Sequence, residues 1–167
     1  HFDVSIATVS PGVLWVLPAS GLTAVGDVGG PFSPASIVYT LTNAGGSSLD
    51  WTAGAAESWL SLDATSGTLA AGATTNITVS INAMADSLAA GSYRDTLVFS
   101  NTSFSETPHS RAITLEVAPV DIRLVGAGSN GQFQITLLGQ PLQTYVLEAS
   151  TNLVDWSGIV TNTTDAG

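Results

Sequence analysis

Two histidines are the residues of this sequence best suited by type to metal chemistry. His1 brings an amino nitrogen and an imidazole nitrogen, and His109, in the stretch ETPHSR, brings a second imidazole. Nitrogen ligands of this kind favour copper. ETPHSR has no ligand spacing of its own, and a constellation of two residues is weakly specific. A copper site formed by His1 and His109 is therefore kept only as the lowest-ranked of three hypotheses, which are given at the end of this section.

Other reactive groups are scarce in the sequence. It has no cysteine and no G-x-S-x-G nucleophile motif, so neither a thiol nor a serine nucleophile is indicated. Asp50 and Asp63 stand beside turn sequences, where Asx residues commonly cap the turn. No D-x-D-x-D-G calcium loop occurs, and we expect no cofactor beyond a structural calcium ion, which the loops of an acidic sandwich could bind through oxygen ligands without that motif. We expect no catalytic residue, and a protein that is not an enzyme.

The charge balance restricts the partners. Only 10% of residues are charged, with 13 acidic residues against three arginines, which gives a net charge of −10. Such a surface repels nucleic-acid phosphates and anionic membranes. No apolar run approaches the roughly 18 residues that cross a bilayer, so we also expect no membrane insertion. Polarity comes instead from Ser, Thr, Asn and Gly, a composition common in secreted β-modules.

The elements that would position any site are β-strands. Apolar residues alternate with polar ones in SIVYTLTN, NITVSI, YRDTLVF and RAITLEV, and a period of two is typical of strands with one buried face. Turn sequences such as NAGGSS and AAGATT separate them. One short helical turn is expected over Ala83–Gly91, with Met84 and Leu88 on one face. The pattern predicts an antiparallel β-sandwich.

A second series of alternating residues follows Pro119. Proline has no N–H to donate to a strand ladder, so the strand that precedes it ends near Ala118. GQFQITLL and TYVLEAS then continue the chain as new strands. The sequence therefore predicts two units, a β-sandwich over residues 1–119 and a small β-domain over residues 120–167.

Residues 17–117 resemble a known family. The stretches GGPFSPASIVYTLTNAGGSSLDW, SWLSLDATSGTLAAGATTNITVSINA and LAAGSYRDTLVFSN are similar to BACON-like, immunoglobulin-like modules of secreted and cell-surface bacterial proteins. The resemblance implies a non-catalytic accessory or spacer beside catalytic domains. A role in carbohydrate binding has been proposed for this family, so the resemblance makes carbohydrate binding an expectation for this chain.

The second unit resembles a β-module found at the C-terminal ends of long secreted bacterial proteins. In that pattern, a block like YVLEASTNLVDW is followed by a further Asp-containing strand and a final aromatic strand, and neither occurs here. The second domain is therefore expected to be incomplete, with Phe133, Tyr145 and Trp156 uncovered. Val4 and Ile6, upstream of the first domain, have the character of a strand that could be donated to another copy.

Aromatic side chains are the route to a glycan site, because rings stack on the apolar faces of sugars. Trp15 in VLWVLP and Phe32 in GGPFSP are the rings we expect to be exposed and able to contact a glycan. Core positions are expected for four other large aromatics of the first domain, namely Tyr39, Trp51, Trp59 and Tyr93.

Three functional hypotheses follow. The first is a structural or accessory module of a secreted or cell-surface bacterial protein, whose partners are other domains of its parent protein or a polysaccharide. The second is a subunit of an extracellular filament or surface layer, in which copies of the chain are joined by strand donation. The third is a copper protein built on His1.

Overall fold

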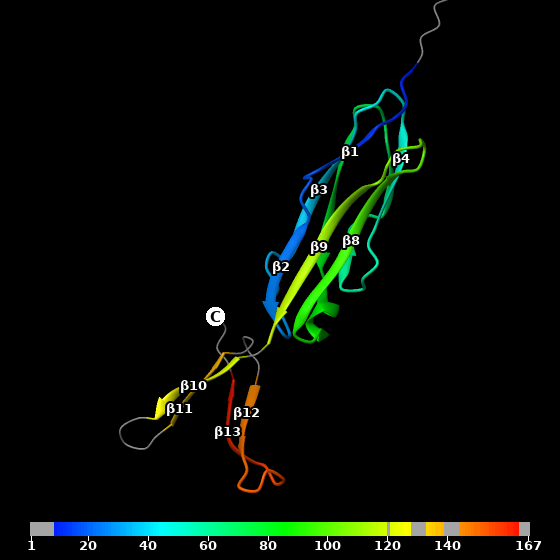
Figure 1. The fold of residues 1–167 in the computed structure, drawn as a ribbon. Coiled ribbons are helices and arrows are strands. Elements are labelled where there is room, and N and C mark those ends of the chain that lie inside the picture. The colour runs from blue at the N-terminus through cyan, green and yellow to red at the C-terminus, as the bar shows by residue number, and fades with distance from the viewer. Residues whose placement is uncertain (1–8, 120, 128–132, 139–143, 164–167) are drawn as a thin grey trace, which may run out of the picture.

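The computed structural model describes residues 9–119, 121–127, 133–138 and 144–163, and it confirms an all-β fold (Figure 1). A single short 3-10 helix, η1 (Ala83–Ser87), interrupts the strands. The strands are β1 (Leu14–Leu17), β2 (Leu22–Asp27), β3 (Ser36–Asn43), β4 (Leu49–Gly54), β5 (Leu60–Leu62), β6 (Ser66–Leu69), β7 (Thr74–Ile81), β8 (Gly91–Asn101), β9 (His109–Ala118), β10 (Asp121–Ala127), β11 (Phe133–Leu138), β12 (Thr144–Ala149) and β13 (Ser157–Thr163).

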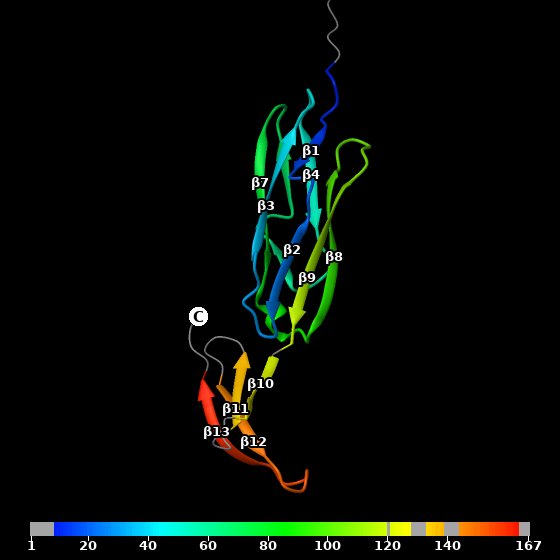
Figure 2. The same cartoon turned by 60° about the vertical axis from the view of Figure 1, so that its left-hand side comes forward.

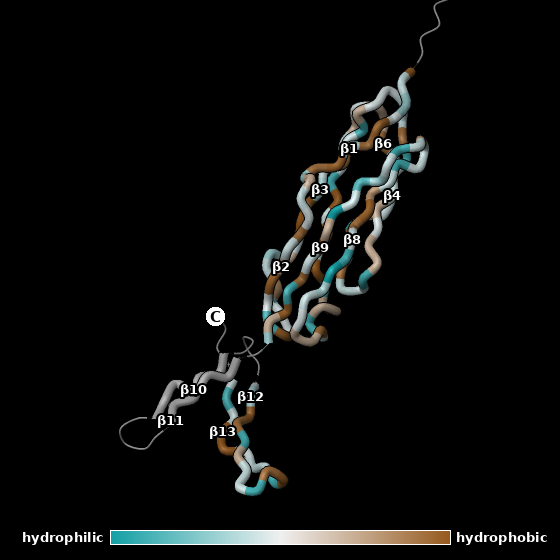
Figure 3. The backbone as a smooth tube through the Cα atoms, in the orientation of Figure 1, coloured by the Kyte–Doolittle hydropathy of each residue, from teal (hydrophilic) through white to brown (hydrophobic). Residues whose placement is uncertain are grey.

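The first nine strands form the two layers of a sandwich. One sheet has four strands in the order β1-β3-β7-β5, and the other has five in the order β2-β9-β8-β4-β6. In β3 and β7, alternate residues face the opposite sheet. Figure 3 shows how hydropathy changes along strands such as β9, in which apolar and polar residues alternate. The predicted sandwich is therefore present, with one buried and one outward face on each sheet.

One strand pair departs from the antiparallel pattern. β2 runs parallel to β9, with six residue pairs from Leu22↔Ile113 to Asp27↔Ala118. The chain leaves the four-stranded sheet after β1, crosses at residues 18–21 and joins the other sheet as β2. Gly21 permits this crossing, because a Cβ at that position would lie 1.7 Å from the carbonyl oxygen of Ala112.

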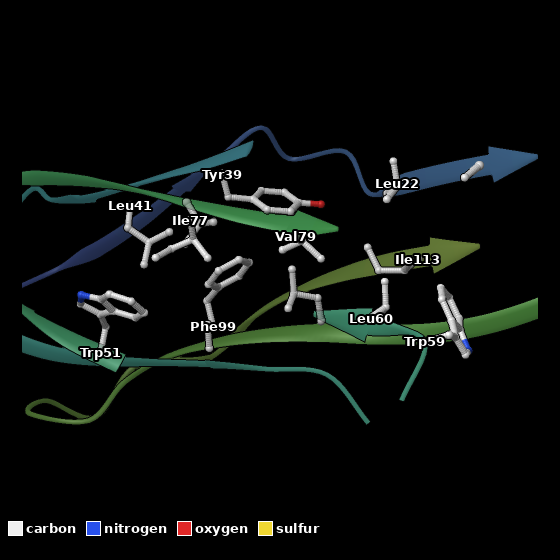
Figure 4. Close-up of a cluster of buried hydrophobic side chains, with 14 of the residues drawn as sticks. Leu22, Tyr39, Leu41, Trp51, Trp59, Leu60, Ile77, Val79, Phe99 and Ile113 are labelled. Atoms are coloured by element: carbon white, nitrogen blue, oxygen red, sulfur yellow. The ribbon is translucent and has the colours of Figure 1, made fainter. Parts of the chain in front are cut away.

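The core lies between the two sheets (Figure 4). The rings of Tyr39 and Phe99 meet edge to face, with centroids 5.3 Å apart and an interplanar angle of 62°. Trp51 and Trp59 are buried, as expected, whereas Tyr93 is only partly buried and donates its hydroxyl to the carbonyl of Ala89. Each fully buried side chain of this size contributes about 1.5–3 kcal/mol through the loss of water contact.

The expected helical turn is shorter than the sequence indicates. η1 ends at Ser87, and the Asn82 side chain caps its start by accepting a hydrogen bond from the Met84 N–H. Ala85 is the residue of η1 that is buried, whereas Met84 is 57% exposed. Leu88, by contrast, follows η1 and packs partly against the core. The expectation that Met84 and Leu88 lie on one helical face is therefore wrong, because a 3-10 turn does not align residues four apart as an α-helix does.

The chain enters and leaves the sandwich at opposite ends. The segment before β1 packs against the β3–β4 turn, where a Cβ on Gly45 would lie 2.0 Å from the carbonyl oxygen of Pro11. β2 and β9 both end at the other pole, where the Val28 N–H donates to the Ala118 carbonyl at 2.9 Å. Figures 1 and 2 show these two poles at the two ends of the long axis of the sandwich.

Beyond the second pole, the strands form two hairpins. β10 pairs with β11, and β12 pairs with β13, both antiparallel and each interrupted by one register shift. β9 ends at Ala118 and β10 begins at Asp121, which is where the predicted boundary lies. The division into two domains nevertheless stays a prediction, tested below.

Candidate functional site

The outward face of the four-stranded sheet combines an exposed tryptophan with uncharged polar groups. We call it the neutral face. Trp15 is 59% exposed and Leu17 is 62% exposed on β1, beside Val38 on β3. The other outward positions carry hydroxyl or amide groups, namely Ser36, Thr40, Thr42, Ser61, Thr74, Asn76, Thr78 and Ser80.

Charge distinguishes this face from the rest of the sandwich. None of the residues within β1, β3, β5 and β7 is charged. By contrast, the strands of the five-stranded sheet carry Asp27, Asp50, Arg94, Asp95, Arg111 and Glu116. An uncharged partner therefore meets a lower desolvation cost on the neutral face than on the outward face of the five-stranded sheet.

The polar groups of the neutral face are partly fixed by their neighbours. The Thr40 hydroxyl donates to Asn76 Oδ1 at 2.9 Å across the paired strands β3 and β7. This bond leaves the Asn76 NH₂ group as an outward donor. At the border of the face, Asp63 follows β5 and accepts from the Thr78 N–H at 2.9 Å. That backbone hydrogen bond is the main cause that lowers the pKa of the Asp63 carboxyl.

The edge strand β1, which carries Trp15, is held by side chains from the other sheet. Arg111 Nη2 donates to the Val16 carbonyl at 2.6 Å, and His109 Nε2 lies 2.8 Å from the Leu14 carbonyl. Glu106 Oε2 accepts from the Leu14 N–H at 3.1 Å. These contacts occupy the Leu14 N–H, the Leu14 carbonyl and the Val16 carbonyl, so an added strand does not find these three groups free.

Arg111 is the buried cation of this arrangement, with 8% of its surface exposed. Its guanidinium donates to three backbone carbonyls, those of Val16, Pro18 and Ser110. It therefore anchors both β1 and the crossing that follows it. The sequence indicated no role for Arg111, because its backbone partners lie more than 90 residues away along the chain in two of these three bonds.

Asn43 is a second anchor that the sequence did not reveal. It is fully buried, and its Oδ1 accepts from the N–H groups of Val13 and Gly45. Its Nδ2 donates to the carbonyls of Ser47, Leu69 and Ala70. One side chain therefore joins the entering segment to two turns at the first pole.

The His109 ring is engaged in contacts that hold β1. Its Nε2 bonds the Leu14 carbonyl and lies 3.9 Å from Glu106 Oε1. A ring that donates through Nε2 has only Nδ1 left for a metal. β9 begins at His109, so this residue lies at the start of a strand. His1 lies outside the described residues, so the copper pair stays a prediction.

The expectation for Phe32 is wrong. Only 7% of its surface is exposed, and it packs in the core. Ser33 bridges to Val25 of β2 through backbone bonds of 2.8 and 2.9 Å, and this bridge holds the loop against the sandwich with the ring inward. Of the two predicted rings, Trp15 is the one at the surface, and its glycan contact stays a prediction.

The predicted assembly residues are spread over several parts of the chain. Val4 and Ile6 lie outside the described residues, as does the side chain of Phe133. Trp156 is 55% exposed, and Tyr145 is partly buried within the β12–β13 hairpin. An apolar surface accompanies Trp156 on this hairpin and its turn, formed by Val146, Leu153, Val154, Ile159 and Val160.

The carboxylates act as backbone anchors. Asp95 Oδ2 accepts from the N–H groups of Ala56 and Glu57 at 3.0 and 2.8 Å, and Asp50 accepts from the Thr68 hydroxyl. Among the described residues, no three His, Asp or Glu side chains are grouped as metal ligands would be. The structural calcium ion stays an untested expectation. The described part of the chain also has no helix long and apolar enough to span a membrane.

The two packed sheets, and the passage of the chain from one sheet at β1 to the other at β2, define an immunoglobulin-like β-sandwich module. A family model described as the viral BACON domain matches residues 33–110. The chain therefore carries a BACON-like β-sandwich module, as the sequence resemblance predicted. The match covers β3 to β8 and reaches the start of β9, whereas β1 and β2 lie outside it.

A search of solved structures found matches at low identity and with TM-scores below 0.5. A chaperone–tip adhesin complex of CFA/I fimbriae biogenesis is 10% identical over 92% of this chain and 82% of its own, with a TM-score of 0.47. A Porphyromonas gingivalis protein of unknown function is 15% identical over 66% of this chain and 55% of its own, with a TM-score of 0.46. A candidate carbohydrate-binding protein from Bacteroides ovatus is 17% identical over 64% of this chain and 42% of its own, with a TM-score of 0.42. A search of curated proteins found no match.

Proposed function

We propose that this chain is a non-catalytic spacer and accessory module of a secreted or cell-surface bacterial protein. The path of the chain through the sandwich carries this proposal. The polypeptide enters at one pole and leaves at the other (Figure 1). A module with this path separates whatever precedes it from whatever follows it.

The spacing that the module would add follows from strand length. β8 has 11 residues and runs along the long axis of the sandwich (Figure 2), which corresponds to roughly 35 Å at the usual rise per residue. The link to β10 is short and contains Pro119, and proline restricts backbone rotation. These features favour a spacer that transmits direction as well as distance.

Localisation of the native protein tests the proposal. Antibodies against residues 9–119 are expected to label intact, unpermeabilised cells or the cell-free culture fraction, and the full reading frame is expected to encode further domains on the same polypeptide. Because the matched family is described from viruses, purified virions from the same culture form a third fraction. A signal confined to the cytoplasm would contradict the proposal.

A second candidate function is contact with a neutral polysaccharide through the neutral face. It is favoured by Trp15, whose exposed ring lies on a face of hydroxyl and amide groups. Sugars offer the complementary chemistry, with apolar C–H faces for the ring and hydroxyls for the polar groups.

Pull-down on insoluble polysaccharides tests this contact. The chain is expected to bind an uncharged polysaccharide such as cellulose or chitin and so to be lost from the supernatant, and Trp15→Ala is expected to abolish this loss. Trp156→Ala is the matched control, because it removes another exposed tryptophan, at 55% against 59%. Equal binding by both variants and the parent chain, or no binding by any of them, would overturn the glycan role of the neutral face.

Strand donation is the remaining alternative for assembly. At β1 the backbone groups flanking Trp15 bond Glu106, His109 and Arg111, and at β2 those of Val25 bond Ser33. Among the described strands, β5 and β6 at the other two edges of the sandwich, and each strand of the two C-terminal hairpins, are paired within their sheets on one side. Light scattering of the full chain at rising concentration checks this alternative, since a strictly monomeric chain would rule out a strand-exchanged filament.

A further inference from the structure

We propose that the sandwich is a load-bearing element, and that the parallel pair β2–β9 is its mechanical clamp. The inference rests on the proposed function, because tension along the polypeptide arises where a module lies in series with other domains. What it adds is a mechanical role assigned to particular strands and side chains. The argument needs only the path of the chain and the contacts along it.

The direction of the two strands sets how tension acts on them. Tension pulls the start of β2 toward the first pole and the end of β9 toward the second (Figure 1). Because the strands are parallel and in register over six residue pairs, this displacement is a shear along their common axis. In shear, the ladder bonds share the load, whereas in unzipping they break one after another. The barrier to rupture is therefore high in this pulling direction.

Side chains hold the segment that leads into the clamp. Arg111, which belongs to β9 itself, bonds the Val16 carbonyl at 2.6 Å and the Pro18 carbonyl at 2.9 Å. The Tyr39 hydroxyl donates to the Ser20 carbonyl at 3.1 Å. β1 is also paired with β3 over four residues. Tension entering at the first pole therefore meets these anchors before it reaches β2.

The far end of the clamp is closed as well. The Val28 N–H donates to the Ala118 carbonyl at 2.9 Å, directly where β9 leaves the sandwich. On the outer side of β2, the backbone of Val25 exchanges two hydrogen bonds with Ser33. β2 is thus held on both edges, although β9 is its only neighbour within the sheet.

Single-molecule pulling on the full chain tests the clamp, and the absence of cysteine allows handles to be attached at chosen positions. Val9→Cys with Pro119→Cys applies the load in shear. Asp27→Cys with Pro119→Cys is the matched control, because Asp27 and Ala118 are register partners and the load then opens the pair from one end. All three positions are exposed.

The unfolding force in the shear geometry is expected to be several-fold higher than in the opening geometry at the same loading rate, because forced unfolding follows the barrier rather than the equilibrium stability. Equal forces, or a lower force in shear, would overturn the clamp. This result is independent of the localisation experiment, so a strong module without neighbouring domains would refute the proposed function alone.

A pair of arginine variants tests the anchor within the same assay. Arg111→Met is expected to lower the shear force while leaving the opening force near that of the parent chain. Arg94→Met, an exposed position on β8, is expected to change neither. If Arg111→Met does not fold, Tyr39→Phe removes the bond to Ser20 from an otherwise intact core. If the shear force were unchanged in every folded anchor variant, these side chains would not contribute to the strength of the clamp.

Discussion

At the scale of single residues, a few buried polar groups determine how the turns and the crossing segment are held. Tyr39 places its ring in the core and its hydroxyl on the Ser20 carbonyl. Burial raises the pKa of this hydroxyl above its ordinary value of 10.0, and the nearby Arg111 charge partly opposes the shift. The folded state therefore holds the Tyr39 proton more tightly than the unfolded state.

This shift predicts a loss of stability at alkaline pH. The contribution of Tyr39 is fully present below the unfolded pKa of about 10 and is lost as the pH rises through the folded pKa. Tyr39→Phe cannot ionise, so its free energy of unfolding should fall less steeply above pH 10. At neutral pH the variant should be less stable by about 1 kcal/mol, through the lost hydrogen bond. Urea unfolding at several pH values measures both effects, and parallel pH curves would contradict the assignment.

Asn43 provides a second prediction at this scale. Asn43→Ala is expected to lower the free energy of unfolding by about 3 kcal/mol, because buried backbone groups at the first pole lose their partners. Asn76→Ala is the control on the neighbouring strand, where the side chain is exposed, and a change within about 0.5 kcal/mol is expected. Chemical denaturation of both variants makes the comparison. A loss of similar size in both would deny Asn43 its anchoring role.

At the scale of the elements, the close approach of the crossing segment to β9 decides whether β2 can join the five-stranded sheet. Gly21→Ala places a methyl group 1.7 Å from the Ala112 carbonyl oxygen, so the backbone has to move. We expect a loss of about 3 kcal/mol. A Cβ at Gly54 meets nothing within 4 Å, so Gly54→Ala is the matched control. If the thermal midpoints of the two variants agreed, the tight crossing would not limit stability.

The elements also show which features the sequence could predict. The alternation of Ile77, Val79, Leu97 and Phe99 predicted strands and their buried faces correctly, because the period of two is a local property. The parallel pairing of β2 was not predicted, since periodicity carries no information on strand direction. Phe32 was expected at the surface, yet the bridge from Ser33 to β2 holds it inward, and this bridge is a tertiary contact that the local sequence GGPFSP does not indicate.

The candidate site also has a part that the sequence could predict and a part that depends on the tertiary fold. The sequence identified Trp15 as an exposed ring, but the neutral face around it comes from the pairing of β1, β3 and β7. The side chains of Arg111 and Glu106 reach β1 across more than 90 residues. Such contacts depend on the tertiary fold, and a pattern within a short window cannot indicate them.

At the scale of the whole molecule, the sandwich contains a complete core before residue 120. Among the residues whose burial the structure describes, those of the buried cluster lie between Leu14 and Val117. A fragment of residues 1–119 is therefore expected to unfold in one cooperative transition, at the temperature of the corresponding transition in the full chain. Calorimetry of both chains measures this. A fragment without a cooperative transition would contradict the predicted two-domain organisation.

The central claim is that the chain passes through the sandwich from one pole to the other. It is tested most directly by the distance between spin labels on Val9→Cys and Pro119→Cys, two exposed positions in a chain without native cysteine. With strands of 10 and 11 residues along the long axis, double electron–electron resonance is predicted to give a single distance of roughly 35–45 Å. A distance below about 20 Å, which is less than the length of one such strand, would place both ends at one pole and contradict the spacer role.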